Sequence, residues 1–163
     1  MAIGIYTAFA QIVEIVRGIT PRTSPDAPFV LEADGGGNVS PLEDYAHGGA
    51  LRRCDIDLAD GGVANNDSGI RTRRMVATTL RVIYGFEAFA GDEVAAKLCA
   101  LDDADLVEQA LADPRNYDGA NTGLETIMGI ESSMSDVQVE DDTSIRMTST
   151  LMTYTFTFLY RRS

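Results

Sequence analysis

The strongest constraint on the fold is a regular alternation of side chains near the C-terminus. Five large apolar residues, Met152, Tyr154, Phe156, Phe158 and Tyr160, alternate with Thr153, Thr155 and Thr157. Successive side chains of a β-strand point to opposite faces of the sheet, and aromatic residues and threonine favour strands. The segment is therefore predicted to be a long strand. Because no basic residues are interleaved with the aromatic ones, the aromatic face is interpreted as core rather than as a surface for stacking nucleic-acid bases.

Alternation elsewhere predicts the rest of the sheet. Strands are expected over 51–58 and 73–86, and these two, with the loop between them, would form a long hairpin. A short strand is expected at 29–31. Weaker patterning over 124–131 and 135–141 predicts one or two further strands.

Spacing of three and four residues predicts the helices. The first covers 3–16, with Tyr6 on its apolar side and Gly18 as its C-cap. Residues 91–113 have the spacing of two consecutive helices. The apolar face of the first would carry Val94, Leu98 and Leu101, and Asp102 or Asp103 would cap the second.

This order of elements defines the expected fold class, which is α+β. It predicts an antiparallel or mixed β-sheet with a long hairpin and with the helices packed on one face. Residues 1–163 would form a single domain with flexible segments near 20–50 and 60–70, where glycine, proline, asparagine and aspartate are dense. The N-terminal stretch has no basic leader and is interrupted by Glu14 and Arg17, so neither an export signal nor a membrane span is expected.

Charge restricts the partners. A net charge of -12 disfavours general nucleic-acid binding, because no broad positive surface is available to release counterions. The positive charges are nearly all arginines, in three clusters: Arg52 and Arg53, then Arg71, Arg73 and Arg74, then Arg161 and Arg162. Arginine pairs bidentately with carboxylates, so these clusters could meet acidic surfaces on a partner. A GC-rich genome would favour arginine equally well without any functional cause.

Residues that commonly perform catalysis are sparse in this sequence. The sole histidine, His47, lies in a glycine-rich irregular segment and is interpreted as a solvated loop residue. The run Gly35-Gly36-Gly37 lacks the lysine and the following hydroxyl residue of a nucleotide-binding loop. Cys54 and Cys99 have no metal-ligand spacing and are expected to be reduced core residues.

Paired carboxylates could bind a cation or perform acid and base chemistry. Asp55 and Asp57 lie on one face of a predicted strand, but they share that face with Arg53, so charge compensation at a solvent-facing strand is the simpler account. The acidic residues Asp102, Asp103 and Asp105 lack EF-hand spacing and are interpreted as helix-capping and solvated residues. No catalytic, metal-binding or cofactor-binding residue is predicted, and no cofactor is expected.

Four segments carry a resemblance to a known family. They are IYTAFAQIVEIVRG at the start, RTRRMVATTLRVIYGF in the middle, DADLVEQALADP in the helical part and TYTFTFLYRRS at the end. In this order they resemble the tail terminator, or tail completion, proteins of tailed bacteriophages. The resemblance implies a small α+β protein without enzymatic activity that forms a ring, expected to be a hexamer. Such a ring caps the phage tail tube, ends its polymerisation and joins it to the head connector.

The resemblance also implies a set of partners and a location. Copies of the same chain, the tail-tube protein and the head–tail connector or stopper protein would be the partners. DNA would pass only as cargo, through a channel whose negative wall lets it slide. No membrane would be involved. The protein would be made in the host bacterial cytoplasm and would reside in the tail or neck of the virion.

A ring of identical subunits needs two different complementary patches on each subunit. The arginine-rich base of the hairpin, facing the acidic stretch 92–113, would provide such a pair. The candidate interface residues are Arg71, Arg73, Arg74, Asp102, Asp103, Asp105, Arg161 and Arg162.

Two alternatives to a tail terminator stay open at this point. The first is another neck or head–tail joining protein or the tail-tube subunit itself, which the geometry of the oligomer would distinguish. The second is a small metal-dependent hydrolase that uses Asp55, Asp57 and His47, which bound divalent metal would reveal.

Overall fold

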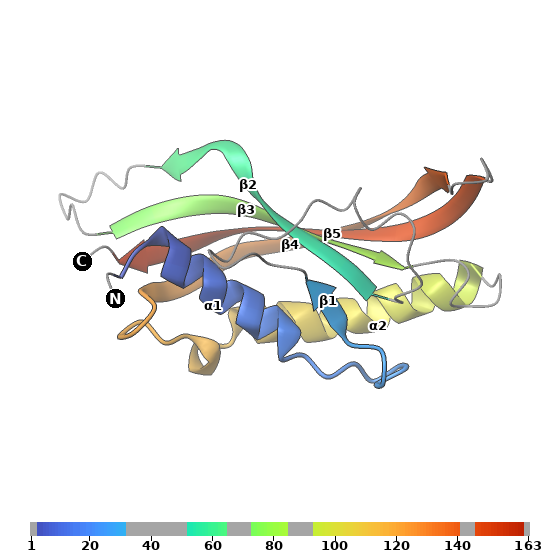
Figure 1. Ribbon diagram of the computed structural model, residues 1–163, viewed down its shortest axis with the longest axis horizontal. Coiled ribbons are helices and arrows are strands. Elements are labelled where there is room, and N and C mark those ends of the chain that lie inside the picture. The colour runs from blue at the N-terminus through green and yellow to red at the C-terminus, as the bar shows by residue number, and fades with distance from the viewer. Residues whose placement is uncertain (1–2, 32–51, 65–72, 85–92, 141–145, 162–163) are drawn as a thin grey trace.

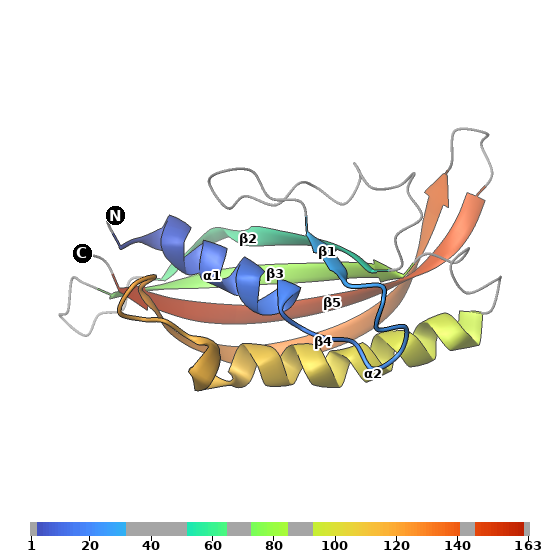
Figure 2. The ribbon, with the colours of Figure 1, turned by 60° about the horizontal axis from the view of Figure 1, so that its bottom comes forward.

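The computed structural model describes residues 3–31, 52–64, 73–84, 93–140 and 146–161. In chain order its elements are α1 (Ile5–Arg17), β1 (Phe29–Leu31), β2 (Arg52–Ala64), β3 (Arg73–Tyr84), α2 (Glu93–Ala112), the short 3-10 helix η3 (Pro114–Asn116), β4 (Leu124–Glu140) and β5 (Arg146–Arg161). The strands form one five-stranded sheet, and α1 and α2 both lie on the same face of it (Figures 1 and 2). The predicted α+β class with a mixed sheet is confirmed.

The strand order across the sheet is β1-β2-β3-β5-β4. Only β1 and β2 are parallel, and the other neighbouring strands are antiparallel. The central pair, β3 and β5, runs in register from Arg73 opposite Arg161 to Tyr84 opposite Thr150. The sheet therefore has two edges, the very short β1 and the long β4.

The aromatic face of β5 forms the core, as its alternation predicts. Phe158 lies opposite Val76, and Tyr154 lies opposite Leu80, and all four side chains are buried beneath the helices. β4 is a single strand rather than two. Its register against β5 shifts between Met128 and Glu131, and the positive φ of 64° at Gly129 accommodates this irregularity.

Helix α1 covers one end of the sheet with an amphipathic face. Its buried side chains include Phe9, Ile12 and Val16, and Gly18 ends it by donating its N–H to the Glu14 carbonyl oxygen at 3.0 Å. Tyr6, expected on the apolar side, is instead 67% exposed. The prediction for Tyr6 was wrong because the helix buries a narrower face than the sequence pattern indicates.

Helix α2 is one continuous helix, so the prediction of two helices with a cap at Asp102 or Asp103 was wrong. Neither glycine nor proline lies between the expected halves, and the weak helix propensity of the aspartates there is overridden by tertiary contacts, since Asp103 pairs with Arg52 in the core. The capping aspartate is Asp113, whose side chain accepts the backbone N–H of Arg115 at 3.0 Å and begins η3.

The face of α2 that packs on the sheet also differs from the prediction. It consists largely of small residues together with one aspartate: Ala96, Cys99, Ala100, Asp103, Ala104, Val107 and Leu111. Small side chains allow the helix to approach the large aromatic residues of the sheet closely. The face expected to be apolar, with Val94, Leu98 and Leu101, points away from the core.

The expected hairpin loop and the glycine-rich segment lie largely outside the described residues, which lack 32–51 and 65–72. His47 and Gly35-Gly36-Gly37 fall in the first of these ranges. What the sequence predicts for them stays a prediction.

Candidate interaction surface

The tightest group of charges lies inside the domain. Arg52 from β2 and Asp103 from α2 both have side chains that are 0% exposed, and Arg52 Nε lies 2.5 Å from Asp103 Oδ2. Tyr84 from β3 donates its hydroxyl to the same carboxylate oxygen at 2.8 Å. Burial alone would lower the pKa of Arg52, but the hydrogen bond to Asp103 and its charge raise it above the usual value. The guanidinium therefore stays charged in the core.

The remaining donors of Arg52 bind the chain that leaves α1. They reach the carbonyl oxygens of Thr23 at 2.5 Å and Ala27 at 2.8 Å, and the guanidinium lies 5.7 Å from the centroid of the Phe29 ring. A single buried arginine thus joins β2, α2 and the 23–29 segment. Its role is to hold the helix layer on the sheet.

Two sequence interpretations are corrected by this cluster. Arg52 cannot meet an acidic surface on a partner, because its side chain is fully buried. Asp103 is neither a solvated residue nor an available interface residue, for the same reason. A buried arginine requires a buried carboxylate to compensate its charge, and Asp103 provides it.

The two cysteines are free and buried, which confirms their assignment as core residues. Burial and then the charge of the nearby Asp103 raise the pKa of the Cys99 thiol to about 11, although Arg52 acts to lower it. Burial likewise raises the pKa of Cys54. Both side chains are thiols rather than reactive thiolates at neutral pH.

Asp55 and Asp57 have different environments. Asp55 is 2% exposed and accepts a hydrogen bond from Arg81 Nε at 2.8 Å, with a second contact from Arg81 Nη2 to its other oxygen. Charge compensation is therefore the right account of Asp55, although its solvent exposure was wrongly predicted, and Arg81 on β3 is its counter-ion. Asp57 is exposed. In the described part of the chain, no three metal-ligating side chains gather closely enough to hold a metal ion.

The basic candidates for an interface gather at one end of the sheet. Arg73 lies opposite Arg161, and Arg74 is the next residue along β3. Arg73 is 45% exposed and forms an ion pair with Glu125 at 2.8 Å, whereas Arg161 is exposed and Arg74 is half-buried. Arg71 and Arg162 lie outside the described residues.

The acidic candidates lie on α2, away from the arginines. Asp105 is exposed, and Asp102 is 31% exposed and binds Arg22 Nη1 at 3.2 Å. The remaining basic candidates therefore lie at one end of the sheet, and the remaining acidic candidates lie on α2.

Sequence reasoning missed the apolar part of this surface. Of the seven large hydrophobic side chains exposed among the described residues, three lie on α2, and a fourth lies on β4, on the sheet face that the helices cover: Val94 at 65%, Leu98 at 62%, Leu101 at 50% and Met134 at 39%. We call these four residues the α2 patch. The helical spacing of Val94, Leu98 and Leu101 was visible in the sequence, but these residues were interpreted as the core-facing side of the helix.

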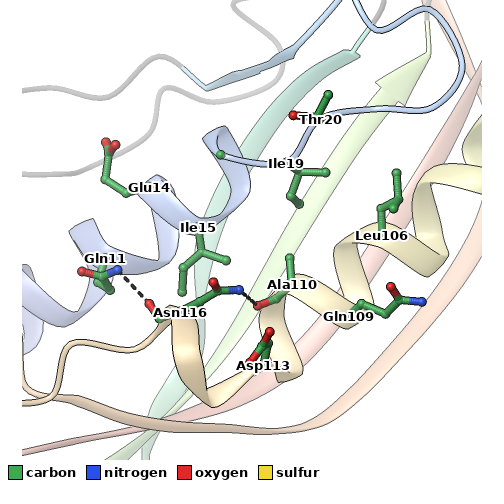
Figure 3. A pocket seen from close by; sticks show the side chains of 11 residues that line it. Gln11, Glu14, Ile15, Ile19, Thr20, Leu106, Gln109, Ala110, Asp113 and Asn116 are labelled. Atoms are coloured by element: carbon green, nitrogen blue, oxygen red, sulfur yellow. Dashed lines mark hydrogen bonds between the residues drawn. The ribbon is translucent and has the colours of Figure 1, made fainter.

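A groove of about 440 Å³ runs between α1 and the end of α2 (Figure 3). Ile15 and Ile19 contribute apolar surface, and Gln11 crosses it to donate a hydrogen bond to the Asn116 carbonyl oxygen at 3.0 Å. The acidic groups on its lining are already paired: Glu14 with Arg17 at 2.9 Å and Asp113 with Arg115 at 2.7 Å. The groove holds less unpartnered apolar surface than the α2 patch.

No family model and no curated protein matches this chain. In the described ranges, neither helix combines the length and the apolar character needed to cross a lipid bilayer.

Proposed function

We propose that this protein is a structural virion protein of the tail terminator type. In this proposal its copies assemble into a ring that caps the phage tail tube, ends tube polymerisation and joins the tail to the head connector. The observation that carries the proposal is the α2 patch. Folded monomers rarely leave several large apolar side chains together in solvent, and such patches typically mark protein–protein contacts.

Two further features support assembly. β4 is a 17-residue edge strand, and long unpaired edges are usually covered by another chain or another element. The chain also carries two chemically different surfaces, one with arginines and one with exposed acidic and apolar side chains. Different complementary surfaces on one subunit generate rings or filaments rather than simple twofold dimers.

The specific assignment to a tail terminator comes from the sequence resemblance. The segments that carry it correspond to the N-terminal helix α1, the strand β3 of the expected hairpin, the helix α2 in place of the expected helical pair, and the threonine-rich C-terminal strand β5. The net charge of -12 suits a channel wall along which DNA slides without binding. In this proposal the protein has no enzymatic role, and its partners are its own copies, the tail-tube protein and the connector or stopper protein.

Negative-stain electron microscopy of the purified protein tests the proposal. Closed rings of uniform diameter, with six subunits as the specific expectation, are the predicted result. Open tubes of varying length would instead identify a tube subunit, which the long edge of β4 would then explain. Particles of monomer size at every concentration would contradict the proposal.

A further inference from the structure

Strand β4 has an open outer edge in the part of the chain that the structure describes. β5 pairs with one side of β4, and no described strand pairs with the other side. Past the irregularity between Met128 and Glu131, β4 pairs regularly with β5. The side chains from Glu131 to Asp136 are all exposed, on both faces of the strand. An edge of this kind is a template for pairing with a further strand.

One line of side chains on α2 runs along this edge, beside β4 (Figure 2). Lys97 Nζ lies 3.7 Å from Asp136 Oδ1. Ser132 Oγ donates a hydrogen bond to Glu108 Oε1 at 2.8 Å. Leu101 lies between Lys97 and Glu108 on the same side of the helix, because residues four and seven positions apart share a helix face, and it is 50% exposed. We call these three residues of α2 the β4-side line.

The two contacts between α2 and β4 define a centre on the strand. Ser132 and Asp136 each lie two residues from Met134, so Met134 is level with the middle of the β4-side line. Met134 is 39% exposed, and its side chain lies on the sheet face that the helices cover, because it lies opposite the buried Met152. The surface around Met134 and Leu101 is therefore apolar at its centre, with a lysine toward one side and a glutamate toward the other. A surface with this layout is complementary to its own copy under a twofold axis.

We infer that two copies of this chain pair their β4 strands antiparallel about a twofold axis at Met134. In this pairing Met134 lies opposite the Met134 of the second copy, Ser132 lies opposite Asp136, and Glu131 lies opposite Val137. No carboxylate in this stretch faces another carboxylate. The two sheets join into one, with the helices of both copies on the same face. The inference goes beyond the proposed function and does not rest on it, because the pair can stand alone or within a larger ring.

Side-chain direction and charge select this register. Opposite side chains in a β-ladder share one face of the sheet, so a twofold pair must be centred on a residue rather than between two residues. Centring the pair on Glu131 or Asp136 would set a carboxylate against its own copy, which destabilises a sheet. Of the four positions between them, three are serines, and Met134 is the one with a large exposed apolar side chain to cover.

The β4-side line meets its own copy in the same arrangement. Asp136 lies opposite Ser132 of the second copy, so Lys97, which lies near Asp136, comes level with the Glu108 that binds that serine. At 3.7 Å from Asp136 the Lys97 ammonium is beyond hydrogen-bonding range, so its donors are available to Glu108. Two such Lys97–Glu108 pairs flank the axis, and the two Leu101 side chains lie between them. A chain with a net charge of -12 needs opposite charges of this kind where it contacts itself.

An engineered disulfide tests the register. Met134→Cys places a thiol directly opposite its own copy, within the reach of a disulfide bond. Glu131→Cys is the matched control, because it is exposed on the same strand but would lie about 20 Å from its own copy in this pairing. Both native cysteines are buried, so the engineered thiol is the accessible one. With oxidised glutathione, Met134→Cys is expected to form a covalent dimer at least roughly tenfold faster than Glu131→Cys, as measured on non-reducing gels.

Charge reversal in the Met134→Cys chain tests the ion pairs across the axis. Lys97→Glu and Glu108→Lys are each expected to slow formation of the covalent dimer about tenfold, because both pairs at the contact become repulsive. A one-to-one mixture of the two charge-reversed chains is expected to recover the original rate, because each reversed charge then meets an opposite charge on the other chain. A purely structural role within one chain would give no such recovery. Circular dichroism verifies that every variant is folded.

Other outcomes separate this contact from the proposed function. Covalent dimers that form equally fast from Met134→Cys and Glu131→Cys would indicate random collisions and would overturn the contact, as would the absence of dimer from both. Charge-reversed chains that cross-link as slowly in a mixture as alone would overturn the pairing of Lys97 with Glu108, and with it the register. Each of these results would leave the proposed ring standing. An unmodified chain that stays monomeric at every concentration would overturn both.

Discussion

Replacing Asp103 by asparagine removes one buried charge and changes little in shape. The carboxylate and the Arg52 guanidinium are both 0% exposed and lie 2.5 Å apart, so the arginine would lose its counter-ion among the described residues. Breaking a buried ion pair by removing one partner costs about 3–5 kcal/mol. The carbonyl oxygens of Thr23 and Ala27 still accept hydrogen bonds from Arg52, so we expect the lower end of that range.

The neighbouring residue provides a matched control. Asp102 is 31% exposed and its partner Arg22 is 55% exposed, so Asp102→Asn should cost less than about 1 kcal/mol. The chain has no tryptophan, so urea unfolding followed by far-UV circular dichroism is the suitable assay. For a domain of this size, about 3 kcal/mol corresponds to a Tm lowered by roughly 6–12 °C. If Asp103→Asn lost no more stability than Asp102→Asn, the assignment of a structural buried pair would be refuted.

Three further substitutions or conditions test the packing. Gly129→Ala should cost about 1–2 kcal/mol from its φ of +64° alone, because the space around the new Cβ is open. Gly123→Ala should cost more than Gly129→Ala, because φ is +81° and a Cβ would also lie 2.8 Å from the Arg161 carbonyl oxygen. Equal losses in urea unfolding would contradict this order. Tyr84→Phe should cost about 1.5–3 kcal/mol, because it removes the hydrogen-bond donor to the buried Asp103 carboxylate. Tyr154→Phe should be close to neutral, since the Tyr154 hydroxyl is buried without a hydrogen-bond partner among the described residues. The reverse order of stability losses in thermal unfolding would refute the network. Stability should fall as pH rises from about 9 to about 11. Burial raises the pKa of Cys99 above its value in the unfolded chain, so the thiol loses its proton first in the unfolded state. Urea unfolding midpoints that stay level from pH 8 to pH 10.5 would count against this prediction.

The C-terminal strand was predictable because its physical signal is local. Alternation over Met152 to Tyr160 requires one buried face, and no tertiary contact is needed to recognise it. β4 was harder to predict as one strand, since its serines and Gly129 weaken the pattern and its register shifts midway. Such irregularities depend on the partner strand rather than on the strand's own sequence.

Helix α2 shows why periodicity alone misassigned a surface. Both sides of the helix carry apolar residues. In its first turns the larger ones, Val94, Leu98 and Leu101, face solvent, whereas Ala96, Cys99 and Ala100 face the sheet. The choice between the two sides is made by Asp103, which must reach Arg52 in the core. That pairing joins residues 51 positions apart, and no spacing rule within one sequence reveals it.

The candidate interface was partly predictable for the same reason. The clustering of Arg73 with Arg161 follows once the two strands are neighbours, because their register places them opposite each other. Which apolar residues of α2 are exposed depends on the side of the helix that packs on the sheet, and only the folded chain supplies that information. The identity of the assembled structure stays a proposal that a measurement must decide.

The most direct test of the account is the mass of the unmodified protein in solution over a wide range of concentrations. Light scattering behind a sizing column should give one discrete assembly, and six copies of the 17.6 kDa chain correspond to about 106 kDa. A mass of one chain at every concentration, or a broad distribution that grows with concentration, would contradict the claim that this protein closes into a ring.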